Sequence, residues 1–140
     1  MEKRIGIDTY VFIDLFSGEE KAEKVRTIIE DIADGKTIGF LSATGISELY
    51  YHLNRLHGEQ IADDRVEYII NLPNLVIVSL GEKISLLAGK LRTKYYKKNI
   101  REISYIDCMH LATALSSDCD NFVTGDKDFK DVSELNVKII

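Results

Sequence analysis

Cysteine, proline and long apolar runs are scarce in this sequence of 140 residues. The two cysteines, Cys108 and Cys119, have a spacing that matches no zinc motif, and no secretory signal precedes them. We therefore expect reduced thiols in a cytoplasmic protein. No apolar run approaches the roughly 20 residues of a membrane-spanning helix, which predicts a soluble protein without a membrane partner. With no repeat, linker or low-complexity segment and with 45% hydrophobic residues, residues 1–140 are expected to form one domain.

Positive charge is outnumbered overall but concentrated in one segment. The formal net charge of -5 disfavours general attraction to nucleic acid. Residues 90–101 contain no acid, however, and we expect them to form a basic helix carrying Lys90, Arg92, Lys94, Lys97, Lys98 and Arg101. With Tyr95 and Tyr96 beside them, the residues that could hold an RNA backbone and stack bases are Lys90, Lys94, Lys97, Lys98 and Arg101. Docking of an acidic protein segment and simple solvation are equally open alternatives.

Short β-branched runs alternate with longer helical patterns, which favours a parallel sheet covered by helices. The single proline, Pro73, lacks a backbone donor and predicts a helix end just before the third strand. The expected strands are 4–8, 37–41, 75–79, 121–124 and 137–140, and the expected helices are 11–16, 20–33, 44–56, 59–71, 82–96 and 105–115.

Acidic residues stand where several of these elements begin or end. Asp8 closes the first strand, and Asp126 follows the strand that ends at Thr124. Both carboxylates should emerge at the carboxyl edge of the sheet, where sites form in open α/β folds. Carboxylates gathered there repel one another, and Mg²⁺ or Mn²⁺ relieves the repulsion through oxygen coordination. The pattern therefore predicts a metal-dependent phosphoryl-transfer site.

Glu48 lies on a helix whose apolar positions predict the face that packs on the core. Those positions recur at helical spacing and are Ile46, Leu49, Tyr50, Leu53 and Leu56. Glu48 falls on the other side, with Thr44, Tyr51 and Arg55 as neighbours. Taken alone, this helix favours a solvated glutamate, and only the other acids make Glu48 a candidate for the site.

Asp107 is the only charged residue of the apolar segment 105–115, which predicts a buried helix. A carboxylate removed from water needs a cation, a metal ion or hydrogen bonds. Ser104 and Asp107 also have the spacing of a capping box, so the aspartate is a helix cap, a metal ligand, or both at once. His110, one turn later, is expected to be a hydrogen-bonded support, because hard cations prefer oxygen.

Four motifs in order resemble the PIN-domain nucleases, especially the VapC-type toxin ribonucleases. They are Ile7-Asp8-Thr9, Ser47-Glu48-Leu49, the segment from Tyr105 to Ala114, and the segment from Val123 to Phe129. The resemblance covers essentially the whole chain. It implies a three-layer α/β/α sandwich with a mainly parallel five-stranded sheet, and a Mg²⁺- or Mn²⁺-dependent endoribonuclease.

The same resemblance implies roles for individual residues and for partners. The family's acidic quartet matches Asp8, Glu48, Asp107 and Asp126. Thr9 and Thr124 match its hydroxyl positions, and Asp128 matches an additional acid of some members. We expect Asp8, Asp107 and Asp126 to hold the metal, and Glu48 to orient the attacking water or bind a second ion. The implied partners are an RNA substrate, an antitoxin protein and a second copy of the chain, paired through an apolar patch on the helices between residues 20 and 71.

Two other functions compete with this prediction. An aspartate-based phosphatase would need a second aspartate two residues after Asp8, where Tyr10 stands, and a phospho-receiver domain would need adjacent acids near the first strand. Both are disfavoured. A non-catalytic PIN-like domain that binds proteins or acts as a scaffold is the other alternative, and the intact set of four acids argues against it.

Overall fold

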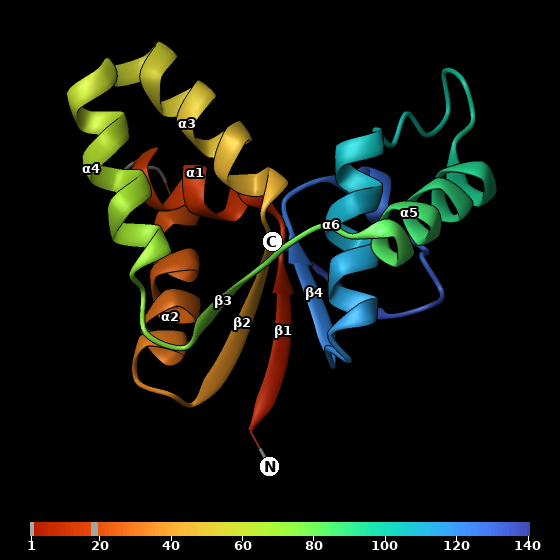
Figure 1. The fold of residues 1–140 in the computed structure, drawn as a ribbon, viewed down its shortest axis with the longest axis horizontal. Coiled ribbons are helices and arrows are strands. Elements are labelled where there is room, and N and C mark those ends of the chain that lie inside the picture. The colour runs from red at the N-terminus through yellow and green to blue at the C-terminus, as the bar shows by residue number, and fades with distance from the viewer. Residues whose placement is uncertain (1, 18–19) are drawn as a thin grey trace.

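A five-stranded sheet forms the centre of the computed structural model, which describes residues 2–17 and 20–140 (Figure 1). Every strand pairing is parallel, and the order is β3-β2-β1-β4-β5. Each strand lies within one residue of its expected range, so the predicted parallel sheet is confirmed. The strands are β1 (Lys3–Ile7), β2 (Thr37–Ser42), β3 (Leu75–Val78), β4 (Asn121–Thr124) and β5 (Asn136–Ile139).

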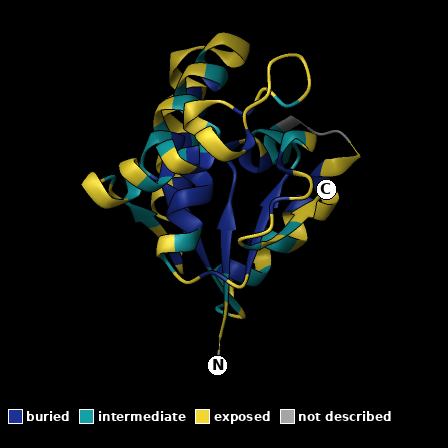
Figure 2. Cartoon of the chain, turned by 90° about the vertical axis from the view of Figure 1, so that its right-hand side faces the viewer, coloured by how far each residue is buried: buried dark blue, intermediate teal, exposed yellow. Residues whose placement is uncertain are grey.

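Helices cover both faces of this sheet. Successive residues of a strand point to opposite faces. Leu41 accordingly packs in a core with α1 to α4, whereas Phe40 packs in a second core with α5 and α6. The central strands β2, β1 and β4 are largely buried between the two layers (Figure 2), which confirms the predicted α/β sandwich. The helices are α1 (Thr9–Ser17), α2 (Lys21–Ala33), α3 (Thr44–His57), α4 (Glu59–Ile70), α5 (Glu82–Tyr95) and α6 (Tyr105–Ser116).

Helix α6 lies directly against β1 because position 6 carries no side chain. A Cβ atom added to Gly6 would stand 2.4 Å from Ala114 Cβ, far inside the normal separation of about 3.5 to 4.0 Å between carbon atoms. The helix begins near the carboxyl ends of the strands and runs back towards their amino ends (Figure 1). This close packing holds the first turn of α6, with Asp107, at the carboxyl edge of the sheet.

Three sequence expectations about surfaces were wrong. Leu56 is 65% exposed, because the end of α3 extends beyond the core that Leu49 and Leu53 fill. The first turn of α6 is also open, with Tyr105 60% exposed, so burial of this helix starts at Cys108. The basic segment does not form one helix either. Helix α5 ends at Tyr95, and residues 97–101 form a loop closed by an antiparallel bridge between Lys97 and Arg101.

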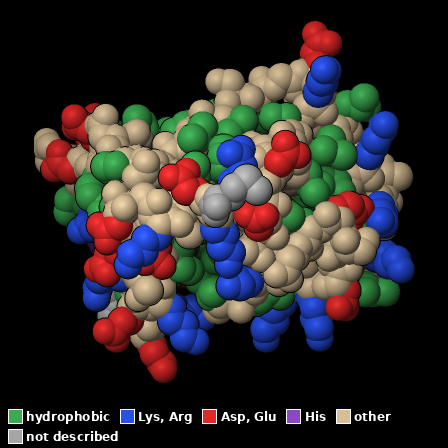
Figure 3. All heavy atoms as spheres, turned by 90° about the horizontal axis from the view of Figure 1, so that it is seen from below, with side chains coloured by type: hydrophobic (Ala, Val, Ile, Leu, Met, Phe, Trp, Pro, Cys, Tyr) green, Lys and Arg blue, Asp and Glu red, His purple; other side chains and the backbone are tan. Residues whose placement is uncertain are grey.

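The outer surfaces of α3 and α4 expose large apolar side chains, as expected for the helices between residues 20 and 71. They are Tyr51, Leu56, Ile61, Tyr68 and Ile70. Homodimerisation through them stays a prediction. The amino edge of the sheet, in contrast, carries both acidic and basic side chains (Figure 3). Within residues 2–17 and 20–140, no helix has the length and apolar character needed to cross a membrane.

Candidate active site

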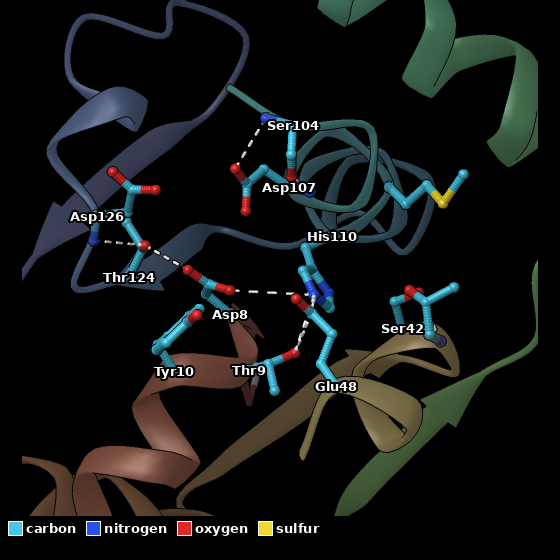
Figure 4. A network of polar contacts seen from close by, with 12 residues as sticks. Asp8, Thr9, Tyr10, Ser42, Glu48, Ser104, Asp107, His110, Thr124 and Asp126 are labelled. Carbon is cyan, nitrogen blue, oxygen red and sulfur yellow. Dashed lines mark hydrogen bonds and ion pairs between the residues drawn. The ribbon is translucent and has the colours of Figure 1, made fainter. Parts of the chain in front are cut away.

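Asp8 occupies the centre of the carboxyl edge, immediately after the middle strand β1. Its backbone amide donates to Val123 O at 3.0 Å, which extends the pairing of β1 with β4 by one residue. Its side chain is 2% exposed, and Oδ2 accepts a hydrogen bond of 2.7 Å from Thr124 Oγ1 (Figure 4). The two residues stand 116 positions apart in the chain and meet because β1 and β4 are neighbours.

Burial dominates the electrostatics of Asp8. Loss of water raises the pKa of this carboxyl to about 6, against an ordinary value of 3.8. Nearby His110 and the hydrogen bond from Thr124 lower it, whereas the negative charges of Asp107 and Glu48 raise it further. The carboxylate is thus ionised at neutral pH, but at a cost that a bound cation would remove.

Glu48 turns inward from α3 instead of facing solvent. Its Oε1 accepts a hydrogen bond of 2.9 Å from Thr9 Oγ1 and lies 2.7 Å from His110 Nε2. Burial raises the pKa of Glu48, but the bonds from His110 and Thr9 outweigh burial, and the net pKa is lowered. The solvated glutamate that α3 alone favoured is therefore wrong, because its two partners come from α1 and α6.

His110 is buried at the centre of this network, as the hydrogen-bonded support that was predicted. Its Nε2 also lies 2.9 Å from Thr9 Oγ1 and 4.0 Å from Asp8 Oδ1. An ionised Glu48 can only accept, so we assign the Nε2 proton to the bond with Glu48. The other ring nitrogen, Nδ1, is buried without a hydrogen-bond partner in the part of the chain that the structure describes.

Asp107 forms the capping box that the sequence predicted. Its Oδ2 accepts from the Ser104 amide at 2.9 Å, and its own amide donates to Ser104 Oγ at 3.0 Å. Burial is the main factor that raises the pKa of Asp107, and the charge of Asp126 raises it further. The cap engages one carboxylate oxygen and leaves Oδ1 facing the other acids (Figure 4).

Asp126 begins the short 3₁₀ helix η1 (Lys127–Phe129), where the sequence predicted only a turn. Its Oδ1 accepts from the Asp128 amide at 2.8 Å, and its amide donates to Thr124 Oγ1 at 3.0 Å. Thr124 thereby links the backbone of Asp126 to the carboxylate of Asp8. Asp128 itself is partly exposed; burial and the charge of Asp126 raise its pKa, and Arg101 lowers it.

Tyr10 lies beside the acids at this edge of the sheet (Figure 4). Its pKa is raised, first by burial and then by the negative charges of Glu48, Asp8, Asp107 and Asp126, in that order. Tyr10 also lies 3.3 Å from His52 Nε2. Reasoning from the sequence missed both residues as parts of this site, although Tyr10 directly follows the Asp8-Thr9 motif on the first turn of α1.

The donor set suits a hard cation. Asp8, Asp107 and Asp126 offer only oxygen, and each uses one oxygen to accept a hydrogen bond that orients the carboxylate. Mg²⁺ and Mn²⁺ prefer such ligands. Among the described residues, no three His, Cys, Asp or Glu side chains are placed so that, as they stand, they could hold a metal ion together.

The basic residues 90–101 divide into engaged and free side chains. Lys94 pairs with Glu134 at 2.9 Å, Arg92 stacks on tyrosines, and Arg101 donates to Lys130 O at 2.6 Å. The free side chains, which are exposed and lack a hydrogen-bond or ion-pair partner within the described parts of the chain, are Lys90, Lys97 and Lys98.

Comparisons with known proteins identify relatives of this fold. The PIN domain family model matches residues 5–135. The chain is similar to one in the structure of VapBC2 from Rickettsia felis bound to a promoter DNA fragment, with a TM-score of 0.76 and 17% identity over 97% of this chain and 98% of that chain. It is also similar to VapC20 of Mycobacterium tuberculosis, a sarcin-ricin loop cleaving toxin, with a TM-score of 0.70 and 16% identity over 94% and 98% of the two chains.

A third similar structure is FitAcB from Neisseria gonorrhoeae, with a TM-score of 0.70 and 21% identity over 96% of this chain and 95% of that chain. No curated protein matches the chain by sequence. At such low identities the solved structures establish the shared fold, and the family model covers nearly the whole chain. The predicted resemblance is confirmed, and the chain belongs to the PIN domain family.

Proposed function

We propose that this protein is a metal-dependent endoribonuclease that hydrolyses phosphodiester bonds in RNA. The observation that carries the proposal is the convergence of four carboxylates at one sheet edge, where Thr124 links Asp8 to Asp126 and His110 lies between Asp8 and Glu48 (Figure 4). Membership in the PIN domain family, a family of nucleases, supports it. The proposed catalytic residues are Asp8, Glu48, Asp107 and Asp126.

Each acid has a distinct part in this proposal. Asp8, Asp107 and Asp126 would hold Mg²⁺ or Mn²⁺ in part through bridging water, because Mg²⁺ dehydrates reluctantly. The ion would offset the negative charge that develops on the phosphoryl and leaving oxygens. Thr124 orients Asp8, and the Ser104 amide fixes Asp107.

Glu48 is proposed to orient the attacking water. Its lowered pKa keeps it ionised at neutral pH, and Thr9 and His110 hold Oε1. Oε2 then remains to accept a hydrogen bond from water. Because a carboxylate with a lowered pKa is a weak base, its contribution is orientation more than proton storage.

Cleavage assays with a matched pair of variants test the proposal. Purified protein is incubated with labelled RNA in Mg²⁺, in Mn²⁺ and in excess chelator, and we expect cleavage only with metal. Asp107→Asn retains an oxygen that can cap α6 but loses the charge, and it should reduce the rate about a hundredfold or more. Asp63→Asn, an exposed position on α4, should cleave like the wild type.

Other outcomes would favour the competing functions. Cleavage that persists in chelator, or that Asp107→Asn leaves unchanged, would contradict the mechanism. Hydrolysis of a small phosphomonoester but not of RNA would favour the phosphatase. A folded protein with no activity under any of these conditions would favour a non-catalytic domain that binds proteins.

We also propose that the protein is the toxin of a toxin-antitoxin pair. Support comes from the similar solved structures, which include a toxin-antitoxin complex from Klebsiella pneumoniae (TM-score 0.67, 21% identity). Expression of the chain alone should arrest bacterial growth, and co-expression of the protein encoded beside it should restore growth. Arrest by the Asp107→Asn variant at equal protein levels would show that the effect is unrelated to RNA cleavage.

A further inference from the structure

An open groove of about 670 Å³ runs between α5 and the first residue of α6. Its lining includes Leu86, Gly89, Lys90, Arg92, Tyr96 and Tyr105. Both tyrosines are exposed, Tyr105 to 60%, although large aromatic side chains gain most from burial. Among the residues that the structure describes, none that lines the groove is acidic. The groove therefore combines open aromatic rings with positive charge.

The two tyrosines are held in place by one arginine. The guanidinium carbon of Arg92 lies 4.2 Å from the ring centre of Tyr96 and 4.1 Å from that of Tyr105. Its Nε donates to Ile103 O at 3.3 Å, which anchors the side chain to the backbone ahead of α6. Contact with Arg92 thus restrains both rings before any ligand arrives, which lowers the entropic cost of stacking on them.

The charge and the aromatic lining of the groove indicate which class of ligand it binds. Lys90 lines the groove without an ion-pair partner in the described residues, so it is available to a phosphate. Every nucleobase has a face that stacks on an aromatic ring, and stacking beside basic side chains is how single-stranded nucleic acids are bound. Double-stranded RNA is excluded because its bases already stack on one another.

The groove and the acidic site share one end of α6. Tyr105 precedes Asp107 by two residues, which corresponds to about 3 Å along the helix axis and about 200° around it. The two side chains therefore leave the same helix turn towards different sides. A single strand with one phosphate at the acids would have to pass around this turn for an adjoining base to reach Tyr105.

We propose that this groove is a nucleobase-binding subsite for a single-stranded RNA segment that flanks the scissile bond. The proposal rests on the proposed nuclease function and specifies its substrate: at least one unpaired base beside the cleaved phosphate stacks on Tyr105 or Tyr96. Lys90 binds the backbone of the same segment.

Binding of a fluorescein-labelled RNA of eight nucleotides, measured by anisotropy in EDTA, tests the subsite without requiring cleavage. Tyr105→Leu keeps apolar bulk but removes the aromatic face, and affinity should fall about tenfold. Tyr68 is a tyrosine on α4 that is 51% exposed, and Tyr68→Leu should bind like the wild type. An oligonucleotide with the same phosphates but abasic residues should bind more weakly than the intact RNA and should be insensitive to Tyr105→Leu.

A second pair of variants avoids any loss of packing. A Cβ atom on Gly89 would meet no atom of the described residues within 4 Å, and replacing a glycine inside a helix favours folding. Gly89→Glu and Gly89→Gln fill the groove to the same extent, but only the first adds negative charge. We expect both to weaken RNA binding and Gly89→Glu to weaken it more, with thermal unfolding unchanged or raised in both.

Three results would overturn the subsite. They are wild-type affinity in both Tyr105→Leu and Gly89→Glu, equal binding of abasic and intact RNA, and preferential binding of a polyglutamate peptide in place of RNA. In each case metal-dependent cleavage by the wild type could still stand. Conversely, base-dependent binding that Tyr105→Leu abolishes would uphold the subsite even if no RNA were cleaved, which separates the two proposals.

Discussion

Replacing Asp8 by asparagine should stabilise the metal-free protein at neutral pH. The pKa of Asp8 is raised from 3.8 to about 6, chiefly by burial. When folding raises the pKa of a carboxyl, the protonated group stabilises the native state at pH values below the unfolded-state pKa. This stabilisation is lost as the pH rises through the folded-state pKa. Above pH 6 the ionised side chain therefore lowers the free energy of unfolding by about 3 kcal/mol.

The asparagine variant removes this charge and keeps an acceptor for Thr124. A neutral acceptor forms a weaker bond than a carboxylate, a loss of about 1 kcal/mol. We expect the variant to be about 2 kcal/mol more stable than the wild type at pH 7.5 in chelator, and no more stable than the wild type at pH 4. Urea unfolding between pH 4 and pH 8 measures the difference, with Asp63→Asn as the control.

Added metal should reverse the order of stability. A ligand at a hundredfold excess over its dissociation constant stabilises the native state by about 2.7 kcal/mol, and the wild type should gain this from Mg²⁺ or Mn²⁺ while Asp8→Asn gains little. The opposite pattern would refute the reasoning. A variant that loses stability in chelator at pH 7.5 but keeps the full metal response would make Asp8 a structural hydrogen-bonding residue outside any metal site.

Three further predictions concern packing, electrostatics and assembly. Gly6→Ala forces a Cβ against Ala114 and should lower the free energy of unfolding by about 1 to 3 kcal/mol. Gly89→Ala, inside α5, meets none of the described residues within 4 Å and should not lower it. Thr9→Val removes one hydrogen bond that lowers the pKa of Glu48, so the acidic limb of the cleavage pH profile should move to higher pH. The hydroxyl of Thr113 bonds within its own helix, so Thr113→Val should leave the acidic limb in place. Leu56→Glu should convert a dimer to a monomer, as measured by light scattering. Leu86 on α5 is also exposed, and Leu86→Glu should leave the dimer intact. A wild type that is already monomeric would contradict the predicted dimer.

Much of the fold and one half of the site are local properties of the sequence. Strands such as β4 (Asn121–Thr124) and helices such as α4 are marked by the spacing of their apolar residues, which burial enforces. The capping box of α6 was predictable because Ser104 and Asp107 are three residues apart and interact within one helical turn. Asp8 and Asp126 were predictable as neighbours because parallel strands end at the same edge.

Only the tertiary structure decided which contacts distant segments make. Glu48 turns inward because its partners Thr9 and His110 lie 39 and 62 positions away, and no pattern on α3 contains them. Lys94 is neutralised by Glu134, 40 positions away, so a run of like charge did not become a uniform basic surface. Local sequence sets backbone conformation and the face that is buried, whereas the charge, pKa and exposure of a side chain depend on the neighbours that folding brings to it.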